Sequence, residues 1–283
     1  MTTVVRSIAD LRAVLSAARF ERGDIGFVPT MGYLHDGHRS LLRRATADND
    51  TTIVSVFVNP LQFAPAEDLD RYPRDLERDV QMASAEGVRY VFAPALVEMY
   101  PEPLMTSVHV AGVSEPLEGV SRPSHFAGVA TVVSKLFAIV GPCRAYFGEK
   151  DFQQLAVIRR MVRDLSMPID VVGCPTIREP DGLAMSSRNV NLTPDARRAA
   201  PVLLRALHAG RDAIAGGERD ATQVRRAMRA VLEREPLVEV DYAEVVDDST
   251  FAIPSPLTGR LRLLIAARLP HARLIDNIGA DAQ

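Results

Sequence analysis

The first ~175 residues of the chain alternate between two hydrophobic periods, and this alternation narrows the choice of fold more than any other feature. Short apolar or β-branched runs, as at Ile25–Val28 and Thr51–Val58, are typical of buried strands, whereas the segments between them carry apolar residues at helical spacing. Strands that alternate with helices form a mostly parallel sheet with helices on both faces. The sequence therefore predicts an α/β protein with a Rossmann-like, doubly wound sheet.

The other segments of this half fit the same pattern. Ser7 is expected to cap one helix, and Pro73 to begin another that Gly87 ends. The stretch from Pro94 to Pro123 is proline-rich and weakly periodic, so we expect an irregular excursion there. The remaining predicted elements are helices from His38, at His125–Val140 and at Asp151–Leu165, and strands at Val88–Phe92, Arg144–Phe147 and Ile169–Val172.

The pattern changes after about residue 176. Thr193 and Pro194 begin a helix expected to reach Ala215, and Asp220 caps a second helix. Strand-like segments follow at Val238–Val246, Arg260–Ala267 and Ala272–Ile275. Helices followed by strands indicate a smaller α+β unit. We therefore predict a first domain over residues 1–176 and a smaller lid domain over residues 177–283.

Charge and composition exclude several classes of protein. The net charge is −3 without a Lys/Arg run, which argues against nucleic-acid partners and a polybasic membrane anchor. The most apolar stretch, Val129–Val140, contains Lys135, and the first residues lack the order of a secretory signal. Cys143 and Cys174 lie far apart without companions at metal spacing. We expect a cytoplasmic protein with no membrane partner.

Two histidines follow the first of these strands, in the segment Met31–His38. His35 and His38 lie three apart at the start of a predicted helix, where imidazole donors beside free backbone N–H groups would form an anion site. Gly37 would let a ligand approach the backbone closely. We interpret the segment as a phosphate site. Solvent-facing histidines and a metal site are the alternatives, although Asp36 is expected to point away from the histidines.

A lysine follows the strand at Arg144–Phe147, in the segment Gly148–Gln154. Lys150 and Gln154 are four apart and face the same way on a helix. A lysine at a helix start opposes the helix dipole, which is reasonable if it meets an anion there. The alternative is a capping box formed by Asp151 and Gln154, which would not explain the lysine.

Two further polar segments fit a site of the same kind. Ser186, Ser187 and Arg188 could grip phosphate oxygens, the arginine in bidentate fashion, unless they form a solvated loop. Asn59 and Gln62 lie just past the strand Thr51–Val58, where neutral amides can hydrogen-bond a hydroxyl or a carboxylate; a polar turn is the alternative. No P-loop, no dinucleotide-binding glycine motif and no nucleophile elbow occurs in the sequence.

Together these four segments resemble the pantothenate synthetase (pantoate–β-alanine ligase) family over nearly the whole chain. The string Pro29–His38 is similar to that family's Pro-Thr-Met-Gly-Ala-Leu-His-Glu-Gly-His, with Tyr33 in place of the alanine and Asp36 in place of the glutamate. His35–His38 also resembles the HIGH signature of nucleotidyl-transferring enzymes, and Met185–Arg188 resembles their mobile KMSKS-like loop.

The resemblance implies a reaction and its participants. Pantoate's carboxylate would attack the α-phosphorus of MgATP and release pyrophosphate, and β-alanine's amine would then attack the pantoyl adenylate to give pantothenate and AMP. The resemblance also implies a cytoplasmic, Mg²⁺-dependent homodimer of the coenzyme A pathway. His38 would be the proton donor, and Gln62 and Gln154 would hold pantoate, with Gln62 also near β-alanine. The residues implied for ATP are Met31, Gly32, Tyr33, Leu34, His35, Asp36, Gly37, His38, Gly148, Glu149, Lys150, Asp151, Ile177, Met185, Ser186, Ser187 and Arg188.

Chemistry assigns narrower roles to a few of these residues. Adenylate formation needs in-line placement and cations where charge builds up on pyrophosphate, which His35, His38, Lys150 and Arg188 can supply. Asp79 is the candidate Mg²⁺ ligand, with a solvated carboxylate near Arg78 as the alternative. Tyr33 points either to solvent or into the pocket mouth. For Glu118 and Arg122 we expect a surface ion pair rather than a position at the edge of the pocket.

Two other functions fit the same residues. A different nucleotidyltransferase would make a stable nucleotide-linked product and pyrophosphate instead of AMP. A nucleotide-sensing module would bind ATP without catalysing exchange, although a sensor has no need for donors aimed at a leaving group.

Overall fold

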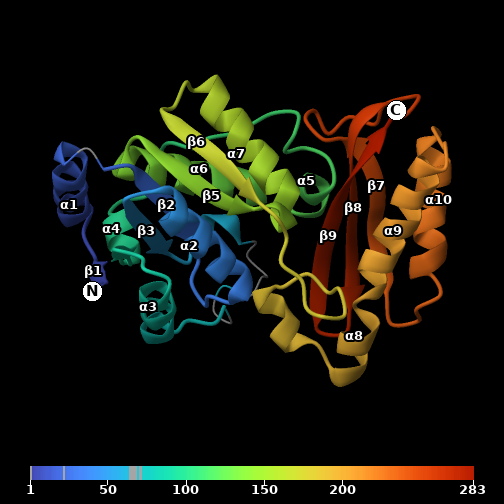
Figure 1. Ribbon diagram of the computed structural model, residues 1–283, viewed down its shortest axis with the longest axis horizontal. Coiled ribbons are helices and arrows are strands. Elements are labelled where there is room, and N and C mark those ends of the chain that lie inside the picture. The colour runs from blue at the N-terminus through green and yellow to red at the C-terminus, as the bar shows by residue number, and fades with distance from the viewer. Residues whose placement is uncertain (1, 22, 64–68, 70–71) are drawn as a thin grey trace. The chain divides into compact units, whose positions relative to one another are not determined.

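The computed structural model describes residues 2–21, 23–63, 69 and 72–283. The chain divides into two compact units. Unit 1 contains Met1–Glu149 and Gln153–Pro175, and unit 2 contains Thr176–Gln283 together with the short segment Lys150–Phe152. The three residues of that segment come from the middle of the chain (Figure 1).

Unit 1 is built on a six-stranded sheet with the strand order β1-β4-β3-β2-β5-β6. Every strand pair in it is parallel. The order reverses direction between β2 and β5, which is the topological switch point of a doubly wound fold. The strands are β1 (Thr3–Val5), β2 (Ile25–Thr30), β3 (Thr51–Val56), β4 (Tyr90–Phe92), β5 (Cys143–Gly148) and β6 (Ile169–Cys174).

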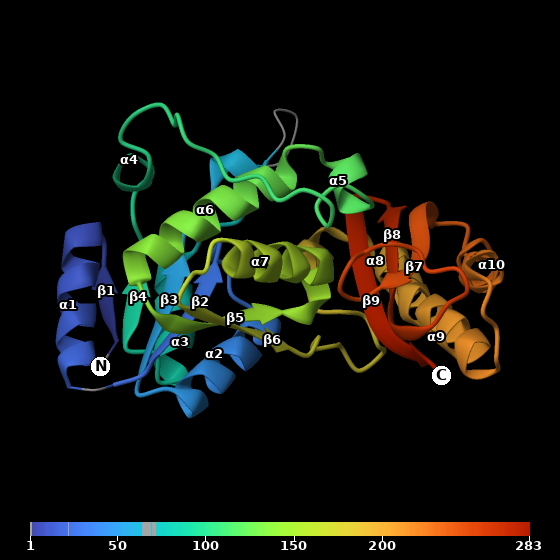
Figure 2. The same ribbon diagram turned by 90° about the horizontal axis from the view of Figure 1, so that it is seen from above.

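Helices cover both faces of this sheet (Figure 2). On one face, Leu41, Leu42 and Ala45 of α2 pack with Ala83 of α3 over Val54 of β3. The opposite face is covered by α1, α6 and α7. These arrangements confirm the predicted doubly wound α/β fold. The helices are α1 (Ile8–Phe20), α2 (Asp36–Asp48), α3 (Leu76–Ala85), α6 (His125–Val140) and α7 (Phe152–Asp164).

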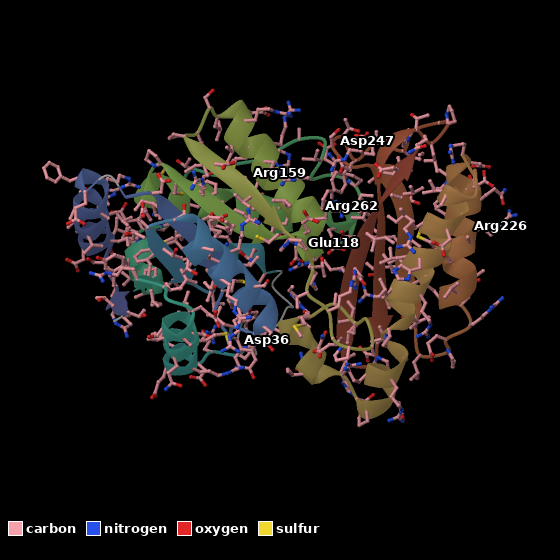
Figure 3. The ribbon with its side chains drawn as sticks, in the orientation of Figure 1. Asp36, Glu118, Arg159, Arg226, Asp247 and Arg262 are labelled. Carbon is pink, nitrogen blue, oxygen red and sulfur yellow. The ribbon has the colours of Figure 1, made fainter. Side chains whose placement is uncertain are left out.

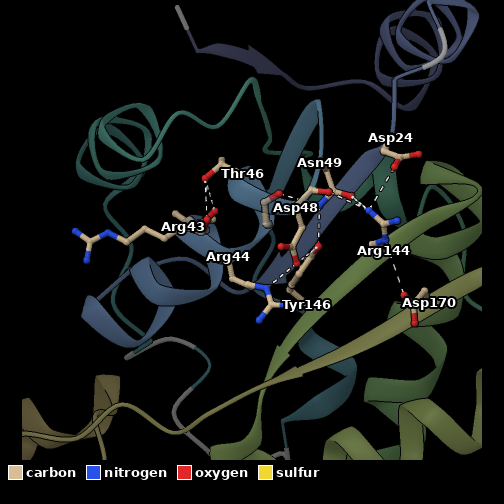
Figure 4. A network of polar contacts seen from close by, with 11 residues as sticks. Asp24, Arg43, Arg44, Thr46, Asp48, Asn49, Arg144, Tyr146 and Asp170 are labelled. Atoms are coloured by element: carbon tan, nitrogen blue, oxygen red, sulfur yellow. Dashed lines mark hydrogen bonds and ion pairs between the residues drawn. The ribbon is translucent and has the colours of Figure 1, made fainter.

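A polar network fixes the C-terminal end of α2 to β5 (Figure 4). The buried Tyr146 hydroxyl donates to Asp48 at 3.1 Å and accepts from Asn49 at 2.7 Å. Burial raises the pKa of Tyr146 to about 12, so the hydroxyl stays protonated. Arg44 pairs with Asp48 at 2.6 Å, and Arg144 donates to the Asp48 carbonyl at 2.9 Å. The helix that begins at the histidine segment is therefore anchored at its far end.

Two details of unit 1 differ from the sequence prediction. The helix expected from Pro73 begins three residues later, because the Asp75 side chain caps it by accepting from the Arg78 N–H. The short edge strand β1 was not predicted, because three residues are too few to show a period. Gly87 follows the helix in the left-handed region at φ +79, as a helix-ending glycine should.

The proline-rich excursion is mostly irregular, as predicted, with the short helices α4 (Leu96–Met99) and α5 (Glu118–Ser121). Its later part is held by Gln153, whose amide donates to the carbonyls of Val113 at 2.9 Å and Pro116 at 2.7 Å. Gln153 Oε1 accepts the Glu118 N–H at 3.1 Å. A single buried glutamine thus contributes three of the hydrogen bonds that hold this irregular segment.

Unit 2 is a three-stranded antiparallel sheet, in the order β7-β8-β9, with α9 and α10 packed on it (Figure 1). Its core includes Leu207 and Met228 from the helices and Leu263 and Ile265 from the central strand. The elements are β7 (Glu239–Asp247), β8 (Gly259–Leu269), β9 (Ala272–Ala282), α8 (Pro194–Ala199), α9 (Val202–Ala215) and α10 (Ala221–Leu232). The sheet and its helices confirm the predicted α+β fold of the smaller unit.

The single helix predicted from Thr193 to Ala215 is wrong, because the segment forms the two helices α8 and α9. Thr193 caps α8 as expected, accepting from the Ala196 N–H at 3.2 Å. Pro201 then lacks the N–H that would continue the helix, and α9 starts one residue later. Within the part of the chain that the structure describes, no helix has the length and apolar character to cross a bilayer.

Candidate active site

The candidate site begins where β2 ends, at the switch point of the sheet. β2 pairs in parallel with both β3 and β5, so the segments that follow these three strands leave the same edge side by side. Ligands of open α/β sheets bind at this edge. The sequence-predicted segments Met31–His38, Asn59–Gln62 and Gly148–Glu149 all start there.

The two histidines form the N-terminal cap of α2. His35 is the N-cap, and its Nδ1 accepts the Gly37 N–H at 3.1 Å. His38 Nδ1 accepts the His35 N–H at 3.3 Å, which completes a reciprocal capping box. The two rings lie with centroids 4.1 Å apart. Because each Nδ1 accepts a hydrogen bond, each neutral ring carries its proton on Nε2, where it is a donor.

The backbone before the histidines is held by Asp79 of α3. Asp79 Oδ2 accepts the Tyr33 N–H at 2.8 Å, and Oδ1 accepts the Leu34 N–H at 2.7 Å. Thr30 Oγ1 accepts the Gly32 N–H at 3.1 Å. These three N–H groups, which precede the helix, are therefore paired within the protein, and the anion site at the helix start stays a prediction. The imidazole Nε2–H groups are the better candidates for phosphate donors.

Two residues of this loop have left-handed backbone. Gly32 has φ +84, and a Cβ there would lie 2.7 Å from Val56 Cγ1 and 2.9 Å from Asp79 Oδ2, so only glycine fits. Tyr33 has φ 51 and, with its N–H bound to Asp79, directs its ring toward Arg78, whose guanidinium carbon lies 5.0 Å from the ring centre. The ring therefore packs on a cation.

Asp79 is 1% exposed, so the alternative of a solvated carboxylate near Arg78 is wrong. Burial raises the pKa of the Asp79 carboxyl, and the two backbone N–H groups offset that rise only in part. Among the described residues, no three His, Cys, Asp or Glu side chains are arranged to hold a metal ion. Mg²⁺ ligation by Asp79 stays a prediction, beside the structural role of holding the loop.

The predicted amides Asn59 and Gln62 contact each other in unit 1, and Gln62 also contacts Met31. Asn59 Nδ2 donates to Gln62 Oε1 at 3.1 Å, and Gln62 Nε2 lies 3.0 Å from Met31 Sδ. The nearly buried Asn59 also donates to the Gly128 carbonyl of α6 at 3.2 Å and accepts from Tyr100 Oη at 2.9 Å. Burial raises the pKa of Tyr100 to about 12, which keeps it a donor. Gln154 is half-buried at the start of α7.

The turn η1 (Pro60–Gln62) is fixed from the other side by residues that sequence reasoning missed or misjudged. The Gln62 carbonyl lies 3.2 Å from Arg122 Nη2 and 3.1 Å from His125 Nδ1. Glu118 is only 6% exposed, so its predicted position at the surface is wrong. Tyr100, Arg122 and His125 lie in or next to the irregular excursion, where no local period links them to the site.

A cavity of about 390 Å³ opens in unit 1 on the α3 side of the same loop. Its wall is mostly apolar, and Arg6 and Arg74 are among the described residues that line it. Met31, Gly32 and Tyr33 line it, but Asn59, Gln62 and Gln154 do not. The cavity therefore adjoins the loop without containing the predicted substrate amides.

Unit 2 holds the predicted lysine and the serine–arginine segment. Lys150 lies in the turn η2 (Glu149–Asp151) with its side chain 17% exposed, and its Nζ is 3.8 Å from Asp151 Oδ1. Ser186 caps the turn η3 (Ser187–Asn191) by accepting the Arg188 N–H at 3.3 Å. Arg188 itself is exposed. The Met185 N–H donates to the Ile177 carbonyl at 3.0 Å, so these two predicted residues are neighbours.

Asp36 is the acidic residue of the first turn of α2 (Figure 3). Its carboxylate lies 3.3 Å from Arg39 and is 61% exposed, so it faces away from the imidazoles, as expected. An acidic residue at a helix start is favourable for the dipole. Asp36 thus stabilises the helix start that carries His35 and His38.

Taken together, the switch-point loop, the paired imidazoles and the glycine-dependent turn define a nucleotide-binding protein of the doubly wound α/β class. The family model described as "Pantoate-beta-alanine ligase" matches residues 3–279. The chain belongs to this family.

Known relatives cover the chain from end to end. A pantothenate synthetase of Caldicellulosiruptor bescii is 51% identical over 280 residues, 99% of each chain, and one of Roseiflexus sp. is 54% identical over 279 residues, 99% of each. The crystal structure of a Thermus thermophilus pantothenate synthetase superimposes with a TM-score of 0.92 at 51% identity, covering 98% of this chain and 99% of that one. A Francisella tularensis pantoate–β-alanine ligase, solved with β-γ ATP and β-alanine, has a TM-score of 0.81 at 32% identity, covering 98% and 97%.

Proposed function

We propose that this protein condenses pantoate with β-alanine at the expense of ATP. In the first step the pantoate carboxylate attacks the α-phosphorus of ATP, the bond to the β-phosphate oxygen breaks, and pyrophosphate leaves. In the second step the β-alanine amine attacks the acyl carbon of pantoyl adenylate, and AMP leaves. The observation that carries this proposal is the family match over residues 3–279, with the paired imidazoles at the switch point of the sheet.

We propose nucleotide ligands in each unit. In unit 1 they are residues of Met31–His38 with Gly148 and Glu149, and in unit 2 they are Lys150, Asp151, Ile177 and Met185–Arg188. His35 and His38 would donate from Nε2, because their Nδ1 atoms accept backbone N–H groups. Lys150 and Arg188 would supply positive charge to the departing pyrophosphate, a kind of stabilisation worth ~3–4 kcal/mol per donor.

Pantoate is proposed to bind Asn59, Gln62 and Gln154. Neutral amides suit a substrate whose carboxylate must attack phosphorus, because a cation bound to that carboxylate would weaken it as a nucleophile. The contact of Gln62 with both Asn59 and Met31 fixes the amide in one orientation. That orientation supports a specificity role, since positioned amides distinguish a hydroxyl from a methyl group.

Magnesium is proposed to enter as part of the substrate, MgATP. Mg²⁺ usually keeps water and phosphate ligands and takes few carboxylates from the protein. Asp79 fits at most a single-carboxylate contact, because each of its oxygens already accepts a backbone N–H. The protein's contribution to the metal would therefore be small, and no step of the reaction is assigned to it.

Exchange of labelled pyrophosphate into ATP tests the reaction directly. We expect exchange with pantoate present and β-alanine absent, no exchange without pantoate, and AMP formation once β-alanine is added. A stable nucleotide-linked product in place of AMP would indicate a different nucleotidyltransferase. ATP binding without pantoate-dependent exchange would indicate a sensor.

We also propose that the protein is a cytoplasmic homodimer that serves the coenzyme A pathway. Exposed apolar side chains between Leu96 and Met105, of which Met105 is 99% exposed, support a protein–protein surface. Light scattering of the purified chain would measure its mass in solution. A monomer at micromolar concentration would refute the dimer without affecting the reaction.

A further inference from the structure

Two adjacent residues of β9, Asp276 and Asn277, hold two different segments that carry proposed nucleotide ligands. Asn277 Nδ2 donates to the backbone carbonyl of Lys150 at 2.8 Å. Asp276 accepts two hydrogen bonds from Arg178, at 2.7 and 2.9 Å. Both β9 side chains are buried, at 4% exposure each. All four residues belong to unit 2.

The Lys150 segment is fixed at a second point by the ring of Phe152. The Arg262 guanidinium carbon lies 3.5 Å from the Phe152 ring centre, and Phe251 stacks on the same ring at 6.1 Å. Arg262, labelled in Figure 3, also donates to Asn277 Oδ1 at 3.2 Å. The Asn277 amide thus connects Arg262 to the Lys150 carbonyl. These contacts explain why Lys150–Phe152 belongs to unit 2 although its neighbours in sequence belong to unit 1.

The Arg178 segment is fixed in a comparable way. Arg178 also donates to the Gly182 carbonyl at 3.0 Å, which closes the turn before Met185. Arg178 and Ala184 form an isolated antiparallel bridge. The Asp276 carboxylate therefore holds the base of the segment that leads to Ser186 and Arg188.

We infer that Asn277 is a positioning residue for Lys150, and that it acts from the same strand on which Asp276 anchors the segment leading to Arg188. The inference rests on the proposed function, because it assumes that Lys150 meets the departing pyrophosphate. Asn277 does not touch substrate in this proposal. It fixes the peptide that carries the lysine, so that the ammonium group is in place before ATP binds.

The physical reason is the precision that charge stabilisation requires. A turn held only by its own short-range bonds would let the lysine sample several positions, and a displacement of about 1 Å can cost on the order of a hundredfold in rate. One hydrogen bond from an amide N–H to a carbonyl contributes little to the free energy of unfolding. It has a large effect on rate only if the held group acts in the transition state.

Replacing Asn277 with aspartate removes this donor but adds a carboxylate, and N277A removes the donor without adding a charge. The N277D side chain has the same size and keeps an acceptor for Arg262, but it presents an oxygen to the Lys150 carbonyl in place of the amide N–H. We expect the kcat of pantoate-dependent pyrophosphate exchange to fall about tenfold, with the KM for pantoate nearly unchanged. K150A should lose about a hundredfold or more.

The double variant decides between positioning and general destabilisation. If Asn277 acts through the lysine, N277D should cause no further loss in the K150A background, because the group it positions is already gone. An equal tenfold loss in both backgrounds, or exchange by N277D at the rate of the parent, would overturn the inference. Should N277D not fold, the smaller N277A takes its place in the same cycle.

D241N is the matched control. It weakens a polar anchor of the same sheet, where Asp241 accepts from Arg268 and Arg273, away from both held segments. We expect it to lower the melting temperature while leaving the exchange rate as in the parent. An exchange rate lowered as much as in N277D would overturn the inference. Failure of the proposed function would be recognised separately, because the unmodified protein would then catalyse no pantoate-dependent exchange.

Discussion

At the scale of single residues, each histidine of the pair has a capping role through Nδ1 and a proposed donor role through Nε2. The Nδ1 atoms of His35 and His38 accept backbone N–H groups and so complete the cap of α2. The same hydrogen bonds place each ring proton on Nε2 and fix the ring planes. A structural role and a donor role are therefore compatible, and a substitution that keeps one of them can separate the two.

His38→Ala and His38→Glu separate the cap from the donor. Glutamate at this position of a helix can still complete a capping box but has no N–H to donate, whereas alanine provides neither the cap nor the donor. We expect both variants to slow adenylate formation by about a hundredfold or more, far more than they slow pantothenate release, and only His38→Ala to lose stability, by about 1 kcal/mol. Single-turnover pyrophosphate release and thermal unfolding measure the two effects, with H208A as the control on α9. Parent-like adenylate formation by both variants would reject the donor role.

The spacing of the histidines and the glycine between them were sufficient to locate a helix start, and the anion site at that start stays a prediction. The partners of the preceding N–H groups were not predictable, because Asp79 is more than forty residues away in the sequence and its helix pattern gives no sign of which loop it meets. The same limit applies to Asn277, whose link to Lys150 spans 127 positions. Local patterns locate functional segments, but they do not reveal what holds them.

At the scale of elements, the turn η1 depends on how closely α6 approaches it. A Cβ on Gly128 would lie 2.2 Å from the Leu61 carbonyl oxygen and 2.7 Å from the Gln62 nitrogen. These are backbone atoms, so a rotamer change cannot relieve the overlap. The glycine is therefore required for close packing, and it sets the place of Gln62 relative to the sheet.

Gly128→Ala should raise the KM for pantoate at least about tenfold, because the displaced turn carries Asn59 and Gln62 with it. We also expect a loss of about 1–3 kcal/mol in the free energy of unfolding. Gly210→Ala is the control, since the atoms nearest its added Cβ belong to the side chains of Leu263 and Met228 in the core of unit 2 and not to backbone. Steady-state kinetics with pantoate varied would measure the effect. Equal KM values for the two variants would contradict this role of α6.

Unit 2 contains an ion pair whose charge state depends on pH. Burial raises the pKa of Asp241, but the hydrogen bonds and charges of Arg273 and Arg268 outweigh burial and hold the pKa below its ordinary value of 3.8. A carboxyl with a lowered folded-state pKa stabilises the protein above the unfolded-state pKa. That stabilisation is lost as the pH falls through the folded-state pKa.

Asp241→Asn should therefore cost stability at neutral pH and cost less in acid. We expect a loss of about 2 kcal/mol at pH 7, the order of a hydrogen bond to a charged group, and a smaller difference from the parent below pH ~3.8. Urea unfolding of both proteins across this pH range measures the difference. A difference that does not change with pH would show that the Asp241 charge contributes nothing.

Most elements were predictable because their periods are long and their caps are local. α6 matches its predicted bounds, and Ser7, Thr193 and Asp220 cap the helices assigned to them. The errors occur where a tertiary effect decides, as in the edge strand β1, which exists through its pairing with β4. The helix breaks at Pro201 because proline has no backbone N–H to continue it. The helical period of the residues on either side hid this break in the sequence.

At the scale of the whole molecule, the units do not follow the order of the chain. Unit 2 takes Lys150–Phe152 from between β5 and Gln153 of unit 1. The strongest reason is the Phe152 ring, which is 5% exposed and lies against Arg262 and Phe251. A proposed catalytic lysine therefore depends for its order on a unit whose residues outside Lys150–Phe152 all follow position 175.

The absence of tryptophan from the chain allows this dependence to be measured with single reporters. Phe152→Trp would report on unit 2 and Phe147→Trp, on β5, would report on unit 1; both rings are 5% exposed in the parent. Leu263→Ala removes a fully buried side chain of unit 2 and should destabilise it by about 2–5 kcal/mol. We expect L263A to lower the midpoint of urea unfolding measured with the F152W reporter more than the midpoint measured with the F147W reporter. The reason is that Phe152 unfolds with the unit that holds it. If the midpoint at position 152 follows the midpoint at position 147 in both backgrounds, the lysine segment unfolds with unit 1, and Asn277 does not hold it.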